Sequence, residues 1–270
     1  MADAVVAAAR QALGSVGVCL PVSFTSPPSA HLQREAVGRL ERAGYRAVWT
    51  NEVIGKDALV QLAMLLGATE HMAFGTCIAN MWARPAQTMH AAAAQLAQAY
   101  PDRFVLGLGV GYPEQAASVG QEFGSPLATV RDYLDRMHTP TWPPAPDAAY
   151  ARIVAANGPK MLALAGEVAD GSLPAMLPPE FTAHARQSLG PDKLLVVGLS
   201  VVVEADADRA KTAAQQAVRG GLDSTAIAAK VGEHLTAGAD HVTLLPPIGT
   251  EFASGIAQLE QLAPALAELG

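Results

Sequence analysis

The sequence predicts a (β/α)8 barrel, an α/β fold in which eight parallel strands alternate with eight helices. Two features of the chain indicate it: short apolar segments alternate with helical segments from end to end, and eight of each can be distinguished. A third is the length, since 270 residues match the roughly 250 residues that are usual for this fold. We therefore expect a single barrel domain over residues 1–270.

The expected strands are rich in Val, Leu, Ile and Ala, as is typical of parallel strands buried on both faces. They cover 16–20, 46–49, 73–77, 103–109, 152–156, 170–176, 194–203 and 241–246. The expected helices cover 29–43, 57–68, 86–99, 126–138, 159–168, 179–189, 206–237, with a break at Gly220 and Gly221, and 251–268. Glycines such as Gly44 and Gly238 end helices just before strands. Chemistry is therefore expected at the opposite rim, after the strands.

Composition narrows the range of partners. The net charge of −7 and the lack of a basic run argue against nucleic acid or an anionic membrane as the main partner. The longest apolar run, 194–203, is too short to span a bilayer as a helix, and the N-terminal segment lacks the features of a signal peptide. We expect a cytoplasmic enzyme or binding protein.

The cysteines and histidines give two further expectations. Cys19 and Cys77 lie in apolar segments, which favours buried free thiols in a reducing compartment over a disulfide. The histidines show no metal-ligand spacing, so no metal site is expected. His234 and His241 flank a turn at the barrel bottom, and His90 is expected to be structural.

The segment RFVLGLGVGYPE, residues 103–114, places three glycines at alternate positions. A dinucleotide-binding loop requires G-x-G-x-x-G after the first strand, whereas Tyr112 stands at the third glycine position and the strand is the fourth. The segment therefore predicts the end of a barrel strand, with Tyr112 and Glu114 as candidates for lining a pocket mouth.

Several segments together resemble the luciferase-like monooxygenase superfamily, in particular its class that uses the deazaflavin coenzyme F420. The main one is AFGTCIANMWARPAQTMHAAAAQLAQAYPDRFVLGLGVG, residues 73–111, and 43–59, 154–171 and 233–245 follow the same order. The resemblance implies an oxidoreductase that transfers a hydride between F420 and a small organic substrate, and a homodimer. An FMN-dependent monooxygenase and a non-catalytic cofactor-binding barrel remain as alternatives.

Two segments, 138–150 and the stretch after the seventh strand, are short compared with the resembling family. Shortened insertions imply a more open rim. An open site protects oxygen intermediates poorly, so this favours hydride transfer over oxygenation.

The resemblance assigns the coenzyme phosphate to Ala156, Asn157 and Gly158. The residues agree with this, since small residues at a strand end lead into Pro159 at the first turn of a helix. Free backbone N–H groups and the helix dipole favour an anion there. Lys160 is interpreted as an exposed lysine rather than a ligand.

At the ring of the coenzyme, the resemblance implies a cis peptide between Cys77 and Ile78 that supports the back of the deazaflavin. Without the family resemblance, Cys77 would be interpreted as a core residue. Gly109 and Gly111 are expected to keep side chains out of the space where the flat ring lies.

Asn51 and Glu52 follow the second strand. The resemblance implies that Asn51 contacts the coenzyme and that Glu52 is a catalytic acid or base, because a carboxylate in a dry pocket can titrate near neutrality. The alternative is that they cap the next helix. Relatives carry Asp and His at these two positions, so the specific proton chemistry of those relatives does not transfer.

Met81, Trp82 and Arg84 follow the third strand. They are expected at the pocket mouth, with packing as the equal alternative.

Overall fold

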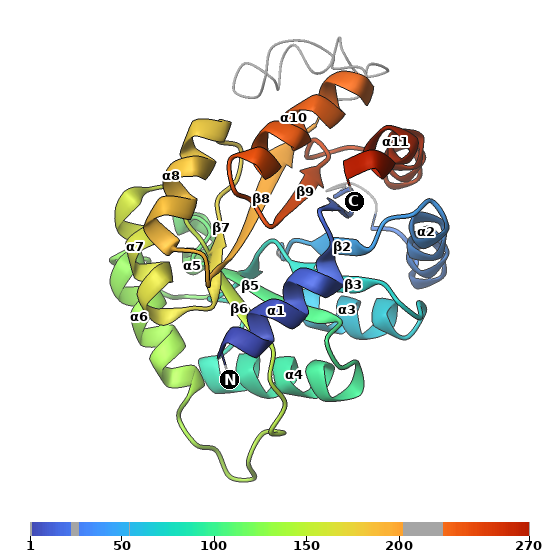
Figure 1. Cartoon of the computed structure of the whole chain (residues 1–270). Helices are drawn as coiled ribbons and strands as arrows, with labels where there is room; N and C mark the ends of the chain where they lie inside the picture. Colours follow the sequence, from blue (N-terminus) through green and yellow to red (C-terminus); the bar gives the residue numbers. More distant parts are fainter. Residues whose placement is uncertain (1, 23–26, 54, 202–223, 270) are drawn as a thin grey trace.

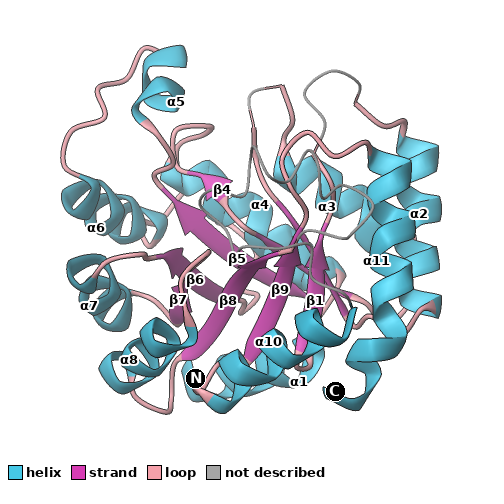
Figure 2. Ribbon diagram, turned by 90° about the horizontal axis from the view of Figure 1, so that it is seen from above, coloured by secondary structure: helices cyan, strands magenta, loops and turns pink. Residues whose placement is uncertain are grey.

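Parallel strands form a closed barrel in the computed structural model, which describes residues 2–22, 27–53, 55–201 and 224–269. The strand order is β3-β2-β1-β9-β8-β7-β6-β5-β4, and a further pairing of β3 with β5 closes the ring. Because the short β4 continues β3 along the same edge of β5, the nine strands occupy eight barrel positions. Helices surround the barrel (Figures 1 and 2). The predicted (β/α)8 fold is confirmed.

The element bounds follow the expected segments closely. The strands are β1 (Val16–Cys19), β2 (Ala47–Thr50), β3 (Ala73–Thr76), β4 (Ala79–Asn80), β5 (Phe104–Gly109), β6 (Ala151–Ala155), β7 (Gly171–Leu173), β8 (Leu194–Ser200) and β9 (His241–Leu245). The helices are α1 (Ala2–Leu13), α2 (Ala30–Arg42), α3 (Ala58–Leu66), α4 (Ala86–Ala99), α5 (Pro113–Ser118), α6 (Pro126–Met137), α7 (Pro159–Val168), α8 (Pro179–Leu189), α10 (Ser224–Thr236), α11 (Phe252–Leu266) and the 3-10 helix η2 (Ala267–Leu269).

Two helices were not expected from the sequence, α1 and the short α5. The expected helix 206–237 coincides with α10 in its second half. Its first half, with the break at Gly220 and Gly221, lies outside the described residues, as do the last two residues of the expected strand 194–203.

Helix α1 closes the bottom of the barrel. Its apolar residues Val6, Ala9 and Leu13 pack in one cluster with residues that begin strands, among them Ala73 and Leu194. Figure 1 shows α1 lying across this end of the barrel. Since the N-terminal ends of the strands are covered by α1, the rim at their carboxyl ends is left for a site.

A buried hydrogen-bond chain ties α1 to the barrel interior. The indole Nε1 of Trp49 donates to Nε2 of His241 over 2.9 Å, and Nδ1 of His241 lies 2.7 Å from the carbonyl oxygen of Gly14. The ring of His241 is therefore neutral, with its proton on Nδ1. His241 lies at the barrel bottom, as the sequence predicts.

The helices pack on the outer face of the barrel through a second, larger apolar cluster. Leu and Val side chains dominate it, for example Val48 and Leu62. No helix within the described ranges is both long and apolar enough to cross a membrane.

Candidate active site

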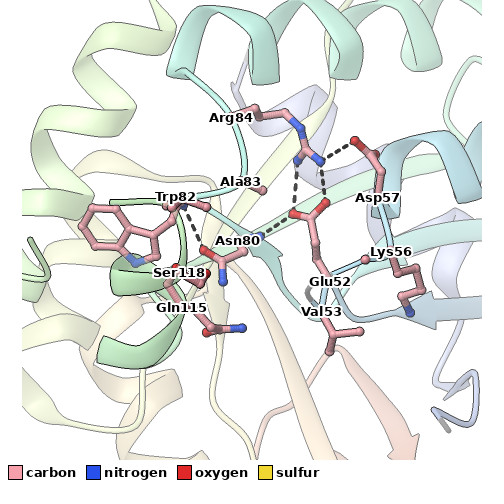
Figure 3. A pocket seen from close by; sticks show the side chains of 12 residues that line it. Glu52, Val53, Lys56, Asp57, Asn80, Trp82, Ala83, Arg84, Gln115 and Ser118 are labelled. Atoms are coloured by element: carbon pink, nitrogen blue, oxygen red, sulfur yellow. Dashed lines mark hydrogen bonds and ion pairs between the residues drawn. The ribbon is translucent and has the colours of Figure 1, made fainter. Parts of the chain in front are cut away.

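A cavity of about 460 Å³ opens at the carboxyl-terminal rim of the barrel, between the segments after β2 and β4 and helix α5 (Figure 3). This is a typical volume for a small-molecule site. It is lined by Glu52, Val53, Gly55, Lys56, Asp57, Asn80, Trp82, Ala83, Arg84, Gln115, Ser118 and Val119. Of the residues predicted to act in catalysis or bind the coenzyme, Glu52 alone belongs to this lining.

Glu52 is buried on the wall of this cavity and accepts hydrogen bonds on both oxygens. Its Oε1 accepts from the backbone N–H of Ala58 at 3.0 Å, and Oε2 from that of Asn80 at 2.8 Å. The guanidinium of Arg84 donates to both oxygens. Because Ala58 is the first residue of α3, the contact matches the alternative interpretation of Glu52 as a cap.

Arg84 also binds a second carboxylate. Its Nη2 lies 2.7 Å from Oδ2 of Asp57, whose Oδ1 accepts from the backbone N–H groups of Leu59 and Val60 and so caps α3. Burial alone would raise the pKa of Asp57, but hydrogen bonds from Val60 and Arg84 outweigh it and lower that pKa. Figure 3 shows Arg84 bridging both carboxylates. The network ties the loop after β4 to the start of α3.

Lys56 has a different environment from Arg84. Its Nζ donates to two neutral oxygens, the Thr50 hydroxyl at 3.0 Å and Oδ1 of Asn51 at 2.9 Å. Burial lowers the pKa of Lys56, partly opposed by its electrostatic interactions with Cys19, Cys77 and Glu52. A lysine with a lowered pKa at a cavity wall is able to exchange protons.

The two thiols lie near Lys56, since Cys19 ends β1, Cys77 directly follows β3 and both interact electrostatically with the lysine. Both cysteines are free, as predicted, and their sulfur atoms are 3.3 Å apart. The peptide bond between Cys77 and Ile78 is cis, as the family resemblance implied.

The opposite wall of the cavity consists of the loop after β4 and of α5. The Trp82 backbone N–H donates to Oδ1 of Asn80 at 2.9 Å, and its indole donates to the Val110 carbonyl at 2.7 Å. Trp82 and Arg84 line the cavity, whereas Met81 is buried in the core. Trp82 and Arg84 thus follow the pocket prediction, and Met81 follows the packing alternative.

Helix α5 supplies Gln115 and Ser118 to the lining, and Val119, the residue that caps its C-terminus, adds a third. Tyr112 and Glu114, the candidates for the pocket mouth, are exposed and lie outside the lining, so that expectation is wrong for this cavity.

Sequence reasoning missed nine of the twelve lining residues, which are Val53, Gly55, Lys56, Asp57, Asn80, Ala83, Gln115, Ser118 and Val119. Lys56 stands directly before the predicted helix 57–68 and Asp57 is its first residue, so their place after the second strand was the available signal. The residues of α5 carried none, since this helix has only six residues.

The glycines of β5 and its rim lie against side chains of the protein itself. A Cβ on Gly109 would lie 2.9 Å from Cδ1 of Ile78, and one on Gly111 would collide with the side chain of Gln115. The room they leave is therefore taken by the protein's own side chains. That they also leave space for a flat ring stays a prediction.

The predicted phosphate residues lie at the end of β6. Gly158 is the N-cap of α7, Pro159 is its first residue, and a Cβ on Gly158 would meet nothing within 4 Å. The side chain of Asn157 is bound on both sides to the backbone of Ala175, at 3.1 and 2.9 Å. Ala156 is buried. Open space for an anion therefore exists at Gly158 and the start of α7, whereas the Asn157 amide fixes the loop.

Comparison with known proteins gives a family. The sequence profile of the luciferase-like monooxygenase family matches residues 15–247. A relative from Mycobacterium tuberculosis, which carries the provisional name coenzyme F420-dependent oxidoreductase, is 30% identical over 196 residues. That match covers 61% of this chain but 56% of the relative, so the chain spans little more than half of its length.

Solved structures share the fold. An F420-dependent secondary alcohol dehydrogenase in complex with an F420-acetone adduct aligns at a TM-score of 0.75 and 16% identity, over 93% of this chain and 98% of that one. The FMN complex of the oxygenating constituent of 3,6-diketocamphane monooxygenase, from a Pseudomonas putida plasmid, aligns at 0.70 and 13%, over 94% and 98%. At such identities the likeness concerns the fold alone. The family profile covers the barrel from β1 to β9, and the chain belongs to the luciferase-like monooxygenase family.

Proposed function

We propose that this chain is an oxidoreductase that binds coenzyme F420 and exchanges a hydride between the deazaflavin ring and a small organic substrate. The family supports a flavin-type cofactor, and the name of the Mycobacterium tuberculosis relative supports F420. The observation that carries the proposal is the presence of two features at one end of the barrel. One is the cavity after β2 and β4, and the other is the open helix start after β6.

The start of α7 fits the phosphate of such a coenzyme. Gly158 adds no side chain, and the first backbone N–H groups of a helix together with its dipole favour an anion. In this proposal Gly158 and the following turn bind the phosphate, while Ala156 and Asn157 shape the loop. Lys160 is exposed at this turn, as the sequence predicts.

The ring would then lie toward the ends of β3 and β5, beside Ile78 and Cys77. Gly109 contributes by letting Ile78 lie against β5, and Gly111 by admitting Gln115. Asn51 would act through its hydrogen bond to Lys56. The F420 ring, once bound, supplies the carbon that accepts or donates the hydride.

Proton transfer to or from the substrate requires a group with a free hydrogen-bonding position. Glu52 was the predicted catalytic acid or base, but its two oxygens already accept four hydrogen bonds. We therefore propose that Glu52 holds Arg84 and the start of α3 in place. Lys56, with its pKa lowered by burial and its ammonium bound to neutral oxygens, is the better candidate for the proton.

An FMN monooxygenase is the second candidate, because a member of the same fold binds FMN. Titration of the purified full chain with F420 and with FMN, followed by fluorescence, separates the two. We expect saturable binding of F420 and weaker binding of FMN. Tight binding of FMN alone would overturn the proposal, and binding of neither would favour a non-catalytic barrel.

A further inference from the structure

The contact between Cys19 and Cys77 is not used by the proposed hydride transfer. Cys19 ends β1 and Cys77 directly follows β3, and β2 lies between these strands. Side chains from alternate strands of such a barrel share one interior layer. Cys19 belongs to the inner apolar cluster and Cys77 packs against it, which brings the two sulfur atoms to 3.3 Å.

The pair is chemically asymmetric. The hydrogen bond with Cys77 lowers the pKa of Cys19 and outweighs burial, which alone would raise it; Lys56 and the Asn51 backbone lower it further. The hydrogen bond with Cys19 and burial raise the pKa of Cys77. Cys19 is thus the more acidic sulfur of the pair and Cys77 the less acidic one, the arrangement of a nucleophile and its partner.

Access to the pair is through Cys77. Cys19 is 5% exposed, whereas Cys77 is half-buried at the carboxyl-terminal rim. Lys56 interacts electrostatically with both cysteines and lines the cavity, so the pair lies near the cavity without forming its wall.

We propose that Cys19 and Cys77 form a redox-active dithiol that closes to an intramolecular disulfide when a peroxide oxidises it. One thiolate attacks a peroxide oxygen, the O–O bond breaks, and a sulfenic acid and water form. The second sulfur then attacks the sulfenic sulfur, an S–S bond forms, and a second water leaves. The two thiols lose two electrons and two protons, and hydrogen peroxide is reduced to two waters.

The geometry suits this closure. A disulfide has an S–S length of about 2.05 Å, so the sulfurs need to approach by only about 1 Å. The chain has two cysteines in all, so every intramolecular disulfide must join this pair.

The test uses the full-length chain without added coenzyme, so it does not depend on the proposed function. The protein is treated with a stoichiometric amount of hydrogen peroxide and examined by intact mass, thiol titration and peptide mapping under non-reducing conditions. We expect the loss of two hydrogen atoms, a fall from two free thiols to none, and a peptide pair joined at Cys19 and Cys77. Dithiothreitol should restore both thiols.

Cys77→Ser gives the matched control, because it keeps Cys19, the sulfur with the lowered pKa. Its remaining thiol should gain oxygen under the same treatment and form no intramolecular bond. The proposal is overturned if the unmodified chain keeps two thiols, gains oxygen atoms without losing hydrogen, or links only to a second copy.

Lys56 tests the activation of the pair. Removing the ammonium with Lys56→Met should slow oxidation about tenfold, because loss of the nearby positive charge leaves less of the attacking thiol in its thiolate form. Lys230→Met, which removes a lysine from α10, should leave the rate unchanged. Equal rates for all three proteins would refute the role of Lys56.

Discussion

Arg84 and Glu52 form a buried ion pair at the cavity wall, with side chains only 10% and 3% exposed. The pair joins the loop after β4 to the loop after β2, and the Glu52 oxygens also hold the N–H groups of Ala58 and Asn80. A pair with so many partners is a structural support of the site, because each removed member leaves an uncompensated charge.

We therefore expect Glu52→Gln to act mainly by lowering the stability of the fold. We expect the free energy of unfolding to fall by about 3 kcal/mol, at the lower end for a broken buried pair because Asp57 still holds Arg84. Adding Arg84→Met should cost less than the two single changes together. Urea unfolding measures all three proteins.

Glu167→Gln is the control for this experiment, since it breaks the exposed pair with Arg131 and should cause no measurable change. If Glu52→Gln retained full stability but lost activity, the acid or base assignment of Glu52 would be correct after all.

Lys56 should control the pH profile of turnover. As the proton acceptor it must be neutral, so the rate of substrate oxidation should rise with pH through a pKa that burial has lowered below that of a free lysine. Lys56→Arg keeps the charge but does not deprotonate, so that rising limb should disappear and kcat should fall by about 10²-fold or more. An unchanged profile would mean that another group moves the proton.

Gly158→Asp tests the proposed phosphate-binding position at the start of α7 without a loss of stability. The added Cβ meets nothing within 4 Å, the backbone is extended, and Asp is a favoured N-cap, so the barrel should fold normally. The carboxylate nevertheless occupies the anion position and should abolish coenzyme binding in the fluorescence titration. Gly158→Asn has the same size and capping ability but no charge, and should bind at least tenfold better than the Asp variant. Equal affinity of all three proteins would remove this turn from the site.

Gly107→Ala should prevent the barrel from closing between β3 and β5. The Thr76 hydroxyl donates to the Gly107 carbonyl at 2.7 Å and accepts from its N–H at 2.9 Å, and an added Cβ would collide with the Thr76 carbonyl oxygen. Backbone cannot yield as a flexible side chain does, so we expect a loss of about 3 kcal/mol or more. Circular dichroism melting gives the measurement. Gly166→Ala, within α7, has ordinary contacts and should be neutral or stabilising.

The barrel could be predicted from the sequence because its strands are continuous apolar runs between helical segments. Helix α1 escaped prediction because its alanine-rich pattern precedes the first strand and fits no βα unit. Its position becomes evident only when Val6 and Leu13 are seen beside residues that begin distant strands.

The site was predictable in its location but less so in its contacts. The strand-end rule identified the segments that hold Glu52, Trp82 and Gly158. It could not show that Arg84 would form an ion pair with the Glu52 carboxylate, since such pairing depends on side-chain directions in three dimensions. It also missed the contact between Cys19 and Cys77. These residues come from alternate strands, and their side chains meet in one interior layer only once the barrel is closed.

His241 provides a pH test of the barrel bottom. Burial lowers its pKa from 6.5 to about 4, with the Gly14 carbonyl partly opposing this. The folded pKa lies below that of the unfolded chain, so the unfolded chain binds the extra proton. Stability is full above pH 6.5 and is lost as the pH falls toward 4, by about 1.4 kcal/mol per unit. Urea unfolding at about pH 7.5, 6 and 5 measures this fall in the free energy of unfolding.

His241→Gln removes this titration while Gln can still accept from Trp49 and donate to the Gly14 carbonyl. We expect the free energy of unfolding of this variant to fall less steeply with acid, because unfolding takes up as much as one proton fewer. The fall is not abolished, since burial also lowers the pKa values of His90 and His234. His71→Gln, on an exposed side chain, should leave the slope unchanged. If both variants follow the unmodified chain, the buried ring of His241 is not a source of acid sensitivity, and the hydrogen bond assigned between Trp49 and a neutral His241 is wrong.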